Sequence, residues 1–334
     1  MQSDQLRLVV LGGTGFIGSA LLRQIAALPQ GDVQTRVLVR TGKEPFPLPS
    51  ATVIAGSLPH DIPQSLFPEE PHVVIHLATR QIDSEPENFY FINVYGTKRL
   101  LAALSPSTLG LIYSSSTSVY GQGPQEDIRE NTPLCPKTEL ARSRAAAEAA
   151  IMSAMAGRGR SAFLLRPRFI LGNEDRYTLP GLIRLVKAGI VVGSGLQAFS
   201  VIDVDDYARI ILILARRILA RANSRSPLCA PFHAGYEQPL HFHEIITAIC
   251  QTLSLPLPRT RIPFRPIIPQ LLRLLPFRSS AALATRLELI GQSHFFNVSA
   301  LSAEIGKEKS EIITRDPLAV LSKALKAYQS RPQP

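Results

Sequence analysis

The sequence predicts an α/β fold built on a doubly wound parallel sheet, and three observations lead to this prediction. The chain opens with an apolar strand, a glycine turn and an apolar helix within residues 8–22. Apolar strand-like runs then alternate with helix-like segments as far as residues 232–235. The 334 residues are enough to bury a large core, in one domain or in a major and a minor one. Strands that alternate with helices are typical of a parallel sheet covered on both faces.

The glycine turn is the most specific motif. The strand over residues 8–11 leads into Gly12, Gly15 and Gly18, spaced G-x-x-G-x-x-G. Gly12 can take a positive φ, Gly15 lets a pyrophosphate approach the backbone, and Gly18 lets the helix pack closely on its strand. The helix, expected over residues 19–28, offers unpaired N–H groups to phosphates. Between a strand and a helix, this spacing favours a dinucleotide site over a glycine turn without a ligand. Further contacts to the dinucleotide are expected from Thr14, Phe16 and Ile17.

Composition and charge exclude several other classes of protein. The formal net charge of +10 fits nucleic acid, an acidic membrane or an anionic ligand. No nucleic-acid motif occurs and the basic residues are spread out, which favours a cationic surface that attracts a phosphate-bearing cofactor. No apolar run approaches the roughly 20 residues of a membrane span, and no signal peptide is visible. Cys135, Cys229 and Cys250 are scattered, which indicates neither a disulfide framework nor a metal site, and a cytoplasmic location is expected.

The second strand ends at a basic residue that bears on the choice of cofactor. Residues 35–39 form this strand, and Arg40 follows it 22 residues after Gly18. An acidic residue there would bond the adenosine ribose hydroxyls, whereas an arginine binds a 2′-phosphate. Thr41 and Lys43 could complete such a phosphate pocket. The sequence therefore favours NADP(H) over NAD(H), the alternative being an ordinary surface arginine.

The next two strands, residues 51–55 and 73–77, end in residues that suit a cofactor passing over the sheet edge. The adenine ring is expected after the first of them, and small residues follow the second. His76 lies inside the second apolar run, so a core histidine is favoured over a catalytic one. A helix is expected over residues 88–104. The cofactor contacts expected from these segments are Ser57, Leu58, Leu77, Ala78, Thr79 and Asn93.

Five hydroxyl residues, 114–118, follow the predicted strand over residues 109–113. The carboxyl ends of parallel strands are where open α/β sheets bind ligands. We expect Ser114 to contact the cofactor and Ser116 and Thr117 to contact the substrate. The strand over residues 161–165 leads to Pro167 on the cofactor side and Arg168 on the substrate side. The remaining expectations are a loop over 122–137, helices over 139–155, 179–188, 207–222 and 241–253, a turn over 190–195, and strands over 200–204 and 232–235.

These segments together resemble the extended short-chain dehydrogenase/reductase superfamily, in its NAD-dependent epimerase/dehydratase and 3β-hydroxysteroid dehydrogenase-like branch. The matching blocks are Gly12–Gly18, His76-Leu77-Ala78, Asn93 to Thr97, Ser114 to Gly121, Arg166-Pro167 and Val204-Asp205-Asp206. They cover residues 6–250, and 295–306 resembles the family's late strand and helix.

The resemblance implies a Rossmann domain and a smaller, partly discontinuous C-terminal substrate domain. The NADP-binding domain would span residues 1–171, with 200–235 returning to it. The substrate domain would span 172–199 and 236–330. A small-molecule carbonyl or alcohol substrate is implied, and a homodimer is an option.

The family's acid–base motif is altered in this chain. The resemblance implies a serine after strand five, at Ser116, and a Tyr-x-x-x-Lys motif on the next helix. In the matching register the tyrosine position is Leu140 and the lysine position is Arg144. Leucine has no proton to give, and a positioned general acid is typically worth about 10²–10⁴ in rate. Arg144 can still hydrogen-bond a ribose, but its pKa is too high for proton transfer at neutral pH. Ser116 and Arg144 remain the expected catalytic residues, with no acid at 140.

Two functions follow from this departure. The first is an NADP(H)-dependent oxidoreductase with a displaced proton donor: Tyr113, Thr117, Arg168, Tyr177 or an ordered water. Hydride transfer depends mainly on the cofactor and its positioning, so loss of the tyrosine need not abolish it. The second is a non-catalytic NADP(H)-binding sensor, regulator or scaffold. The hydroxyl-rich strand end and the complete substrate domain favour the first.

The segment over residues 256–277 mixes arginines with large apolar residues. Within it, residues 267–275 could form an amphipathic helix that lies weakly on a membrane or under a lipid-like substrate. A substrate-domain helix packed on the core is the favoured alternative.

Overall fold

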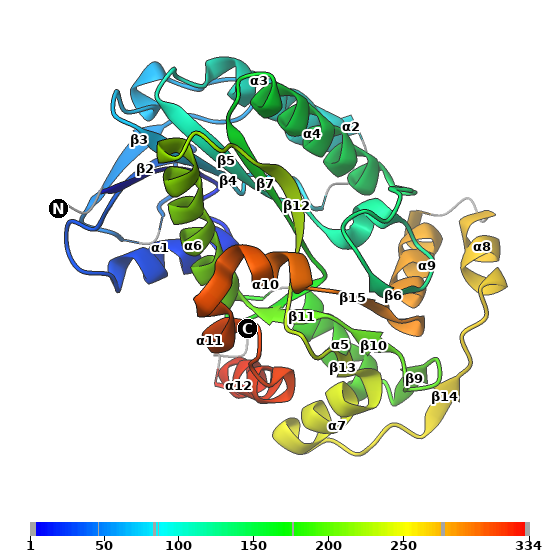
Figure 1. The fold of residues 1–334 in the computed structure, drawn as a ribbon. Coiled ribbons are helices and arrows are strands. Elements are labelled where there is room, and N and C mark those ends of the chain that lie inside the picture. The colour runs from blue at the N-terminus through cyan, green and yellow to red at the C-terminus, as the bar shows by residue number, and fades with distance from the viewer. Residues whose placement is uncertain are drawn as a thin grey trace.

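A seven-stranded parallel sheet forms the centre of the molecule (Figure 1). The computed structural model describes residues 5–45, 47–82, 85, 87–175, 177–274 and 278–330. The strand order is β12-β7-β5-β4-β1-β2-β3, so the direction of winding reverses between β1 and β4. This confirms the predicted doubly wound fold. The strands are β1 (Leu6–Leu11), β2 (Val33–Val39), β3 (Ala51–Ala55), β4 (His72–His76), β5 (Thr108–Ser114), β7 (Ser161–Pro167) and β12 (Cys229–Ala234).

Helices cover both faces of this sheet (Figure 1). Successive strand residues point to opposite faces, so Val10 and Ile112 join the core under α1 and α6, while Val9 and Leu111 join the core under α3 and α4. Burial on both faces explains why the strands are almost continuously apolar. The helices are α1 (Phe16–Ala26), α2 (Glu87–Phe89), the π-helical segment η2 (Tyr90–Tyr95), α3 (Gly96–Ala103), α4 (Glu139–Ala156) and α6 (Val204–Asn223).

The remaining elements build a smaller region beside the carboxyl ends of the strands. Its largest sheet has the order β13-β10-β15-β6, and two further strand pairs are β8 with β11 and β9 with β14. Its strands are β6 (Gln125–Ile128), β8 (Phe169–Leu171), β9 (Ile190–Val192), β10 (Ala198–Phe199), β11 (Val201–Asp203), β13 (Leu240–His241), β14 (Thr260–Ile262) and β15 (His294–Phe296). Its helices are α5 (Thr178–Lys187), α7 (Phe242–Leu253), α8 (Ile267–Leu274), α9 (Arg278–Gly291), α10 (Ser299–Ile305), α11 (Lys309–Ile312) and α12 (Pro317–Gln329). The short 3₁₀ turns are η1 (Gln64–Leu66), η3 (Thr117–Tyr120) and η4 (Gly306–Glu308).

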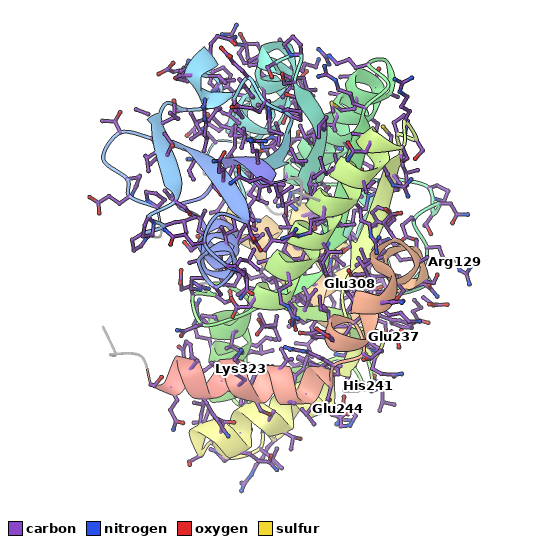
Figure 2. All side chains as sticks on the ribbon, turned by 60° about the vertical axis from the view of Figure 1, so that its left-hand side comes forward. Arg129, Glu237, His241, Glu244, Glu308 and Lys323 are labelled. Carbon is purple, nitrogen blue, oxygen red and sulfur yellow. The ribbon has the colours of Figure 1, made fainter. Side chains whose placement is uncertain are left out.

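Helix α12 packs on α7 at the base of this region. In Figure 2, Lys323 marks α12, and His241 and Glu244 mark the start of α7. The His241 N–H donates to Glu244 Oε2 at 2.8 Å, one half of a capping box that fixes where α7 begins. Within the part of the chain that the structure describes, no helix is long and apolar enough to cross a membrane.

Several local expectations differ from the structure. Helix α1 begins at Phe16 rather than residue 19, because Gly15 is already its N-cap. The loop predicted over 122–137 contains β6, whose polar sequence hides its pairing with β15. The turn predicted over 190–195 contains β9, which pairs with β14. The helix predicted over 88–104 is interrupted by the π segment η2, a feature that often accompanies functional sites.

Candidate functional site

A cavity of about 310 Å³ lies at the carboxyl end of the central sheet. Its inner wall comes from the start of α1 at Phe16 and Ile17, from the serines after β5, and from α4. Its outer wall comes from β8, α5, α9 and β15, which belong to the smaller region. The cavity therefore joins the glycine turn to residues more than 250 positions away. Its polar lining includes Ser114, Ser115, Ser116, Ser118, Gln122, Lys137, Arg144, Arg168, Asp175, Tyr177, Glu288 and His294.

The glycine turn has the geometry that a bound pyrophosphate needs. Gly12 has a φ of +90°, and a Cβ on Gly18 would lie 2.2 Å from the Gly12 carbonyl oxygen. A Cβ on the exposed Gly15 would meet only that oxygen, at 3.3 Å. No side chain caps the N-terminus of α1, and no acidic residue lies in its first turn. The free N–H groups and the open glycine fit a phosphate-bearing cofactor.

Ser114, Ser115 and Ser116, at the end of β5 and just after it, form a polar part of the cavity wall that we call the serine shelf. Ser114 Oγ bonds the Tyr207 hydroxyl at 2.8 Å. Ser115 Oγ is buried without a hydrogen-bond partner. Ser116 Oγ accepts from the Ser118 N–H at 3.1 Å, which leaves the Ser116 hydroxyl proton available to a ligand oxygen. Ser116 thus has the exposure and the free donor that its predicted role requires.

Helix α4 brings Leu140 and Arg144 to the same cavity wall. Thr138 caps the helix by accepting from the Ala141 N–H, and the i, i+4 spacing puts both residues on one face. The Arg144 side chain is buried and donates from Nη1 to the Ser115 carbonyl at 2.8 Å, while its Nε has no partner. Burial lowers the pKa of Arg144, and the nearby phenols of Tyr113 and Tyr207 partly offset this effect. Arg144 therefore braces the serine shelf and keeps one donor unused.

A buried ion pair supports the inner wall from behind. Arg166 donates to both carboxylate oxygens of Glu148, at 3.0 and 2.6 Å, and to the Tyr120 hydroxyl at 2.6 Å. Tyr120 in turn bonds His233 Nε2 at 2.8 Å. Burial acts to lower the pKa of Arg166, but the bonds to Glu148 outweigh it and the pKa is raised. This network ties β7, α4, η3 and β12 together beneath the site.

The outer wall carries Arg168, Glu288 and His294. Arg168 Cζ lies 5.1 Å from the centre of the Phe169 ring, and the buried Nε and Nη2 of Arg168 have no acceptor. His294 Nε2 bonds the Glu288 carbonyl oxygen at 3.1 Å, and His294 Nδ1 has no partner. Burial, aided by the charge of Arg168, lowers the pKa of His294 to about 3. His294 is therefore neutral at physiological pH.

Several of the residues predicted to contact the cofactor are occupied by other roles or lie at the surface. Asn93 is buried and bonds the Arg80 backbone and the Ser143 hydroxyl, so it holds the loop after β4 against α4.

Leu58 packs against α3 at Gly96, and Ser57 pairs with Asp61 in a tight turn. Arg40 is exposed at the end of β2. Near the switch point, Gly12 packs directly on Leu77 and Ala78, and Thr79 bonds the Leu77 carbonyl. Pro167 lines the cavity, and Thr14 lies within the glycine turn.

The proton-donor candidates separate into two groups. Tyr113 and Thr117 are fully buried and do not line the cavity, and burial raises the pKa of Tyr113. Tyr177 and Arg168 do line it. The expected core histidine, His76, is fully buried and lies 2.9 Å from the Thr97 hydroxyl.

Sequence reasoning missed Gln122, Lys137, Glu288 and His294 as cavity residues. They come from a loop and from the far C-terminal region, without a local motif. A lysine three positions before Leu140 was a weak indication that one of them, Lys137, could face the site. In the described ranges, no group of three or more histidine, cysteine, aspartate or glutamate side chains is arranged to hold a metal ion.

The fold and the site together define an α/β protein with a glycine turn at the uncapped N-terminus of α1 and a polar cavity at the carboxyl end of its central sheet. Residues 8–225 match the family model described as the NAD dependent epimerase/dehydratase family. The chain belongs to this family. This confirms the resemblance inferred from the motifs.

Curated relatives include sugar-modifying and redox enzymes. One is N-acetyl-alpha-D-glucosaminyl-diphospho-ditrans,octacis-undecaprenol 4-epimerase from Escherichia coli O157:H7, 23% identical over 77% of this chain and 75% of that protein. A second is 4-hydroxy-2-methyl-3-oxo-4-farnesyl-3,4-dihydroquinoline-1-oxide ketoreductase from Stigmatella aurantiaca, 31% identical over 54% of this chain and 55% of that protein. A third is the decarboxylating sterol-4-alpha-carboxylate 3-dehydrogenase of Homo sapiens, 26% identical over 79% and 71%.

Solved structures agree on the fold. A crystal structure of a putative epimerase from Burkholderia cenocepacia J2315 has a TM-score of 0.71 at 19% identity and covers 99% of this chain and 100% of that chain. UDP-galactose 4-epimerase has a TM-score of 0.70 at 18% identity, with coverage of 97% and 99%. At these identities the likeness shows the shared fold alone.

Proposed function

We propose that the protein is an NADP(H)-dependent oxidoreductase that interconverts a carbonyl and an alcohol on a small molecule, with a non-standard proton donor. One observation carries this proposal: the start of α1 beside the glycine turn, the serine shelf and Arg144 share one cavity with a wall of polar groups from the smaller region. Buried polar atoms without partners gather there, which is expected where a ligand completes the hydrogen bonds. Ketoreductase and dehydrogenase relatives support the redox assignment.

The inner wall is the proposed cofactor side, and we assign it to the proposed NADP-binding domain, residues 1–171 with 200–235 returning to it. The N-terminus of α1 would hold the pyrophosphate, and Arg144, braced on the Ser115 carbonyl, would reach the nicotinamide ribose through its unused Nε. The exposed Arg40 would take the 2′-phosphate and so favour NADP(H) over NAD(H). The dinucleotide, when bound, supplies or accepts the hydride.

The outer wall is the proposed substrate side, contributed by residues 172–199 and 236–330 together with Arg168. From the facing inner wall, Ser116 would donate a hydrogen bond to the substrate oxygen, because its Oγ already accepts from the Ser118 N–H and its hydroxyl hydrogen stays available. Leu140 cannot supply the proton that completes reduction of a carbonyl to an alcohol. Lys137 and Tyr177 line the same cavity and have transferable protons, so either of them, or a water they hold, would act in its place.

A second candidate function is a non-catalytic NADP(H)-binding sensor, regulator or scaffold. The observation that favours it is Leu140, an apolar side chain on the cavity wall where the family motif places a tyrosine. This function predicts unequal affinities for NADP⁺ and NADPH, or a partner whose binding depends on the nucleotide. A partner whose capture ignores both nucleotides would argue against a sensor.

A cytoplasmic protein, a homodimer and weak contact of residues 256–277 with a membrane remain part of the proposal. Exposed apolar side chains on α8 support the membrane contact: Ile267, Leu271 and Leu274 are 52%, 55% and 80% exposed. No acidic residue occurs between Glu244 and Glu288, so the segment is basic as well as apolar. Residues 275–277 lie outside the described residues.

The deciding experiment traces hydride transfer without a known substrate. The full-length protein is incubated with a metabolite extract and NADPH carrying deuterium at C4, in both stereoisomers, and products are screened by mass spectrometry. A deuterium-bearing metabolite that requires the protein establishes an oxidoreductase and names its substrate class. No labelled product, with NADPH binding demonstrated, moves the assignment to the non-catalytic function.

Ser116→Ala tests the placement of the reaction. Removal of the hydroxyl that would bond the substrate oxygen is expected to lower the labelling rate by about 10- to 100-fold. Ser224→Ala, at the exposed end of α6, is the matched control and should leave the rate unchanged. An unchanged rate in Ser116→Ala would move the reacting centre away from the serine shelf.

A further inference from the structure

Among the residues that the structure describes, Arg168 lies on the cavity wall without a hydrogen-bond or ion-pair partner. It connects β7 to β8, and its guanidinium lies beside the Phe169 ring. The buried Nε and Nη2 have no hydrogen-bond acceptor, and no ion pair involves this side chain in the part of the chain that the structure describes. Burial without an acceptor lowers the pKa of Arg168, yet a guanidinium keeps its charge at neutral pH. The wall therefore holds an uncompensated positive charge.

Two carboxylates on the same cavity wall are committed to other partners. The Glu288 carboxylate accepts hydrogen bonds from both terminal nitrogens of Arg273. Asp175 accepts the backbone N–H groups of Tyr177, Thr178 and Leu179, and so caps the start of α5. Glu288 thus joins α9 to α8, and Asp175 caps α5. Neither carboxylate pairs with Arg168.

Other arginines nearby show that an unpaired guanidinium is not the rule here. Arg166, two residues earlier, donates two hydrogen bonds to the Glu148 carboxylate. It donates further hydrogen bonds to the Tyr120 hydroxyl and the Glu130 carbonyl. Arg144 bonds the Ser115 carbonyl. Buried charged groups normally have an ion-pair or a hydrogen-bond partner, as Arg166 and Arg144 do, so a guanidinium that faces a cavity with neither points to a ligand of opposite charge.

The neighbours of Arg168 fit the same kind of ligand. Lys137, an exposed lysine on the cavity wall, adds a second positive charge. His294 is neutral and donates from Nε2 to the Glu288 carbonyl oxygen, so it adds no charge to the wall, and its Nδ1 could accept only from a hydroxyl or N–H group elsewhere on the ligand. Arg273 offsets the charge of Glu288, so Lys137, Arg144 and Arg168 outnumber the one remaining carboxylate, Asp175, and the excess positive charge attracts an anion.

We propose that the substrate carries a carboxylate or a phosphate group that pairs with Arg168, while its reacting carbonyl or alcohol lies at Ser116. This inference rests on the proposed function for the reacting group and names the class of substrate: an anionic small molecule. A guanidinium matches both carboxylate and phosphate through two parallel N–H bonds. Since Arg168 is not fixed by hydrogen bonds, its side chain can turn to meet the anion.

Calorimetric titration tests the subsite without any turnover. Inorganic phosphate and benzoate, a carboxylate on an apolar ring, are titrated separately into the full-length protein, with and without NADP⁺, at constant ionic strength. At least one probe should bind wild type, and Arg168→Gln should weaken it by tenfold or more. Arg168→Lys should retain part of the affinity, and Arg99→Gln, an exposed arginine on α3, should retain all of it. The probe that binds distinguishes phosphate from carboxylate.

Three results would overturn the proposal: no binding of either probe by wild type, equal binding by Arg168→Gln, or a loss of NADP⁺ affinity in that variant, which would assign Arg168 to the cofactor. Arg168→Gln should melt at the wild-type temperature or above, because it removes an unpaired buried charge. Its folding is thereby checked. The calorimetric titrations involve no redox step. A negative titration would therefore leave the oxidoreductase proposal intact, and a negative deuterium experiment would leave the anion site intact.

Discussion

The buried Glu148–Arg166 pair allows the support of the inner wall to be measured. The two side chains are 3% and 5% exposed, and their shorter contact is 2.6 Å. In Glu148→Ala, Arg166 keeps only the Tyr120 hydroxyl and the distant Glu130 carbonyl, at 2.6 and 3.4 Å. Neither group carries a compensating charge. The loss expected when one partner of a buried pair is removed is about 3–5 kcal/mol in the free energy of unfolding.

Urea unfolding followed by far-ultraviolet circular dichroism measures this loss, since the chain has no tryptophan to report by fluorescence. Glu139→Ala is the control, because Glu139 and Arg142 form an exposed pair at 2.8 Å, 56% and 54% exposed. Its effect should stay below about 1 kcal/mol. The double variant Glu148→Leu/Arg166→Met removes both charges and should recover most of the stability. Equal, small losses in Glu148→Ala and Glu139→Ala would refute the reasoning.

Three further predictions concern pH, the cofactor and the surface. Burial lowers the pKa of His76 to about 4, whereas an unfolded histidine titrates near 6.5, so the unfolded chain binds the proton first. The free energy of unfolding should fall by about 3 kcal/mol for this group as the pH drops from about 6.5 to about 4. His76→Gln should flatten the slope of unfolding free energy against pH, and an unchanged slope in this variant would contradict the prediction. Arg40→Glu should weaken NADPH by about 10- to 100-fold relative to NADH in fluorescence titrations, and an unaltered ratio would place the 2′-phosphate elsewhere. Leu271→Glu/Leu274→Glu should abolish any flotation with anionic liposomes, and wild type that stays in the soluble fraction would remove the membrane contact.

The central sheet could be predicted because its information is local. Each strand is a short apolar run, each helix has its own periodicity, and Gly12 to Gly18 fix the first crossover. β6 was missed because its sequence, Gln-Glu-Asp-Ile, has no apolar pattern and its partner β15 lies about 170 residues away. An edge strand held by such a distant partner leaves no periodic trace.

The residues of the candidate site also divide into those that a local motif predicts and those that only long-range packing brings to the cavity. The inner wall was accessible from motifs, since Ser116, Leu140 and Arg144 stand at fixed offsets in one continuous stretch. The outer wall was not, because His294 and Glu288 reach the cavity only through the packing of the C-terminal region. Asn93 shows the opposite failure: its motif position suggested the cofactor, and the structure gives its amide to Arg80 and Ser143. The roles and domain limits assigned from motifs stay predictions.

Arg144 stands where the resemblance predicts a lysine, and its side chain contacts the backbone of the serine shelf. A guanidinium is long enough to donate to the Ser115 carbonyl from within α4, so residue 144 fixes the shelf that carries Ser116. Its pKa is too high to relay a proton, and Leu140 beside it has none. Under the proposed function, Ser116 and Arg144 on the inner wall would orient the substrate, and neither Arg144 nor Leu140 would protonate it. The proton for carbonyl reduction would then come from Lys137 or Tyr177, which line the same cavity, so the proposed substrate side would also supply the proton.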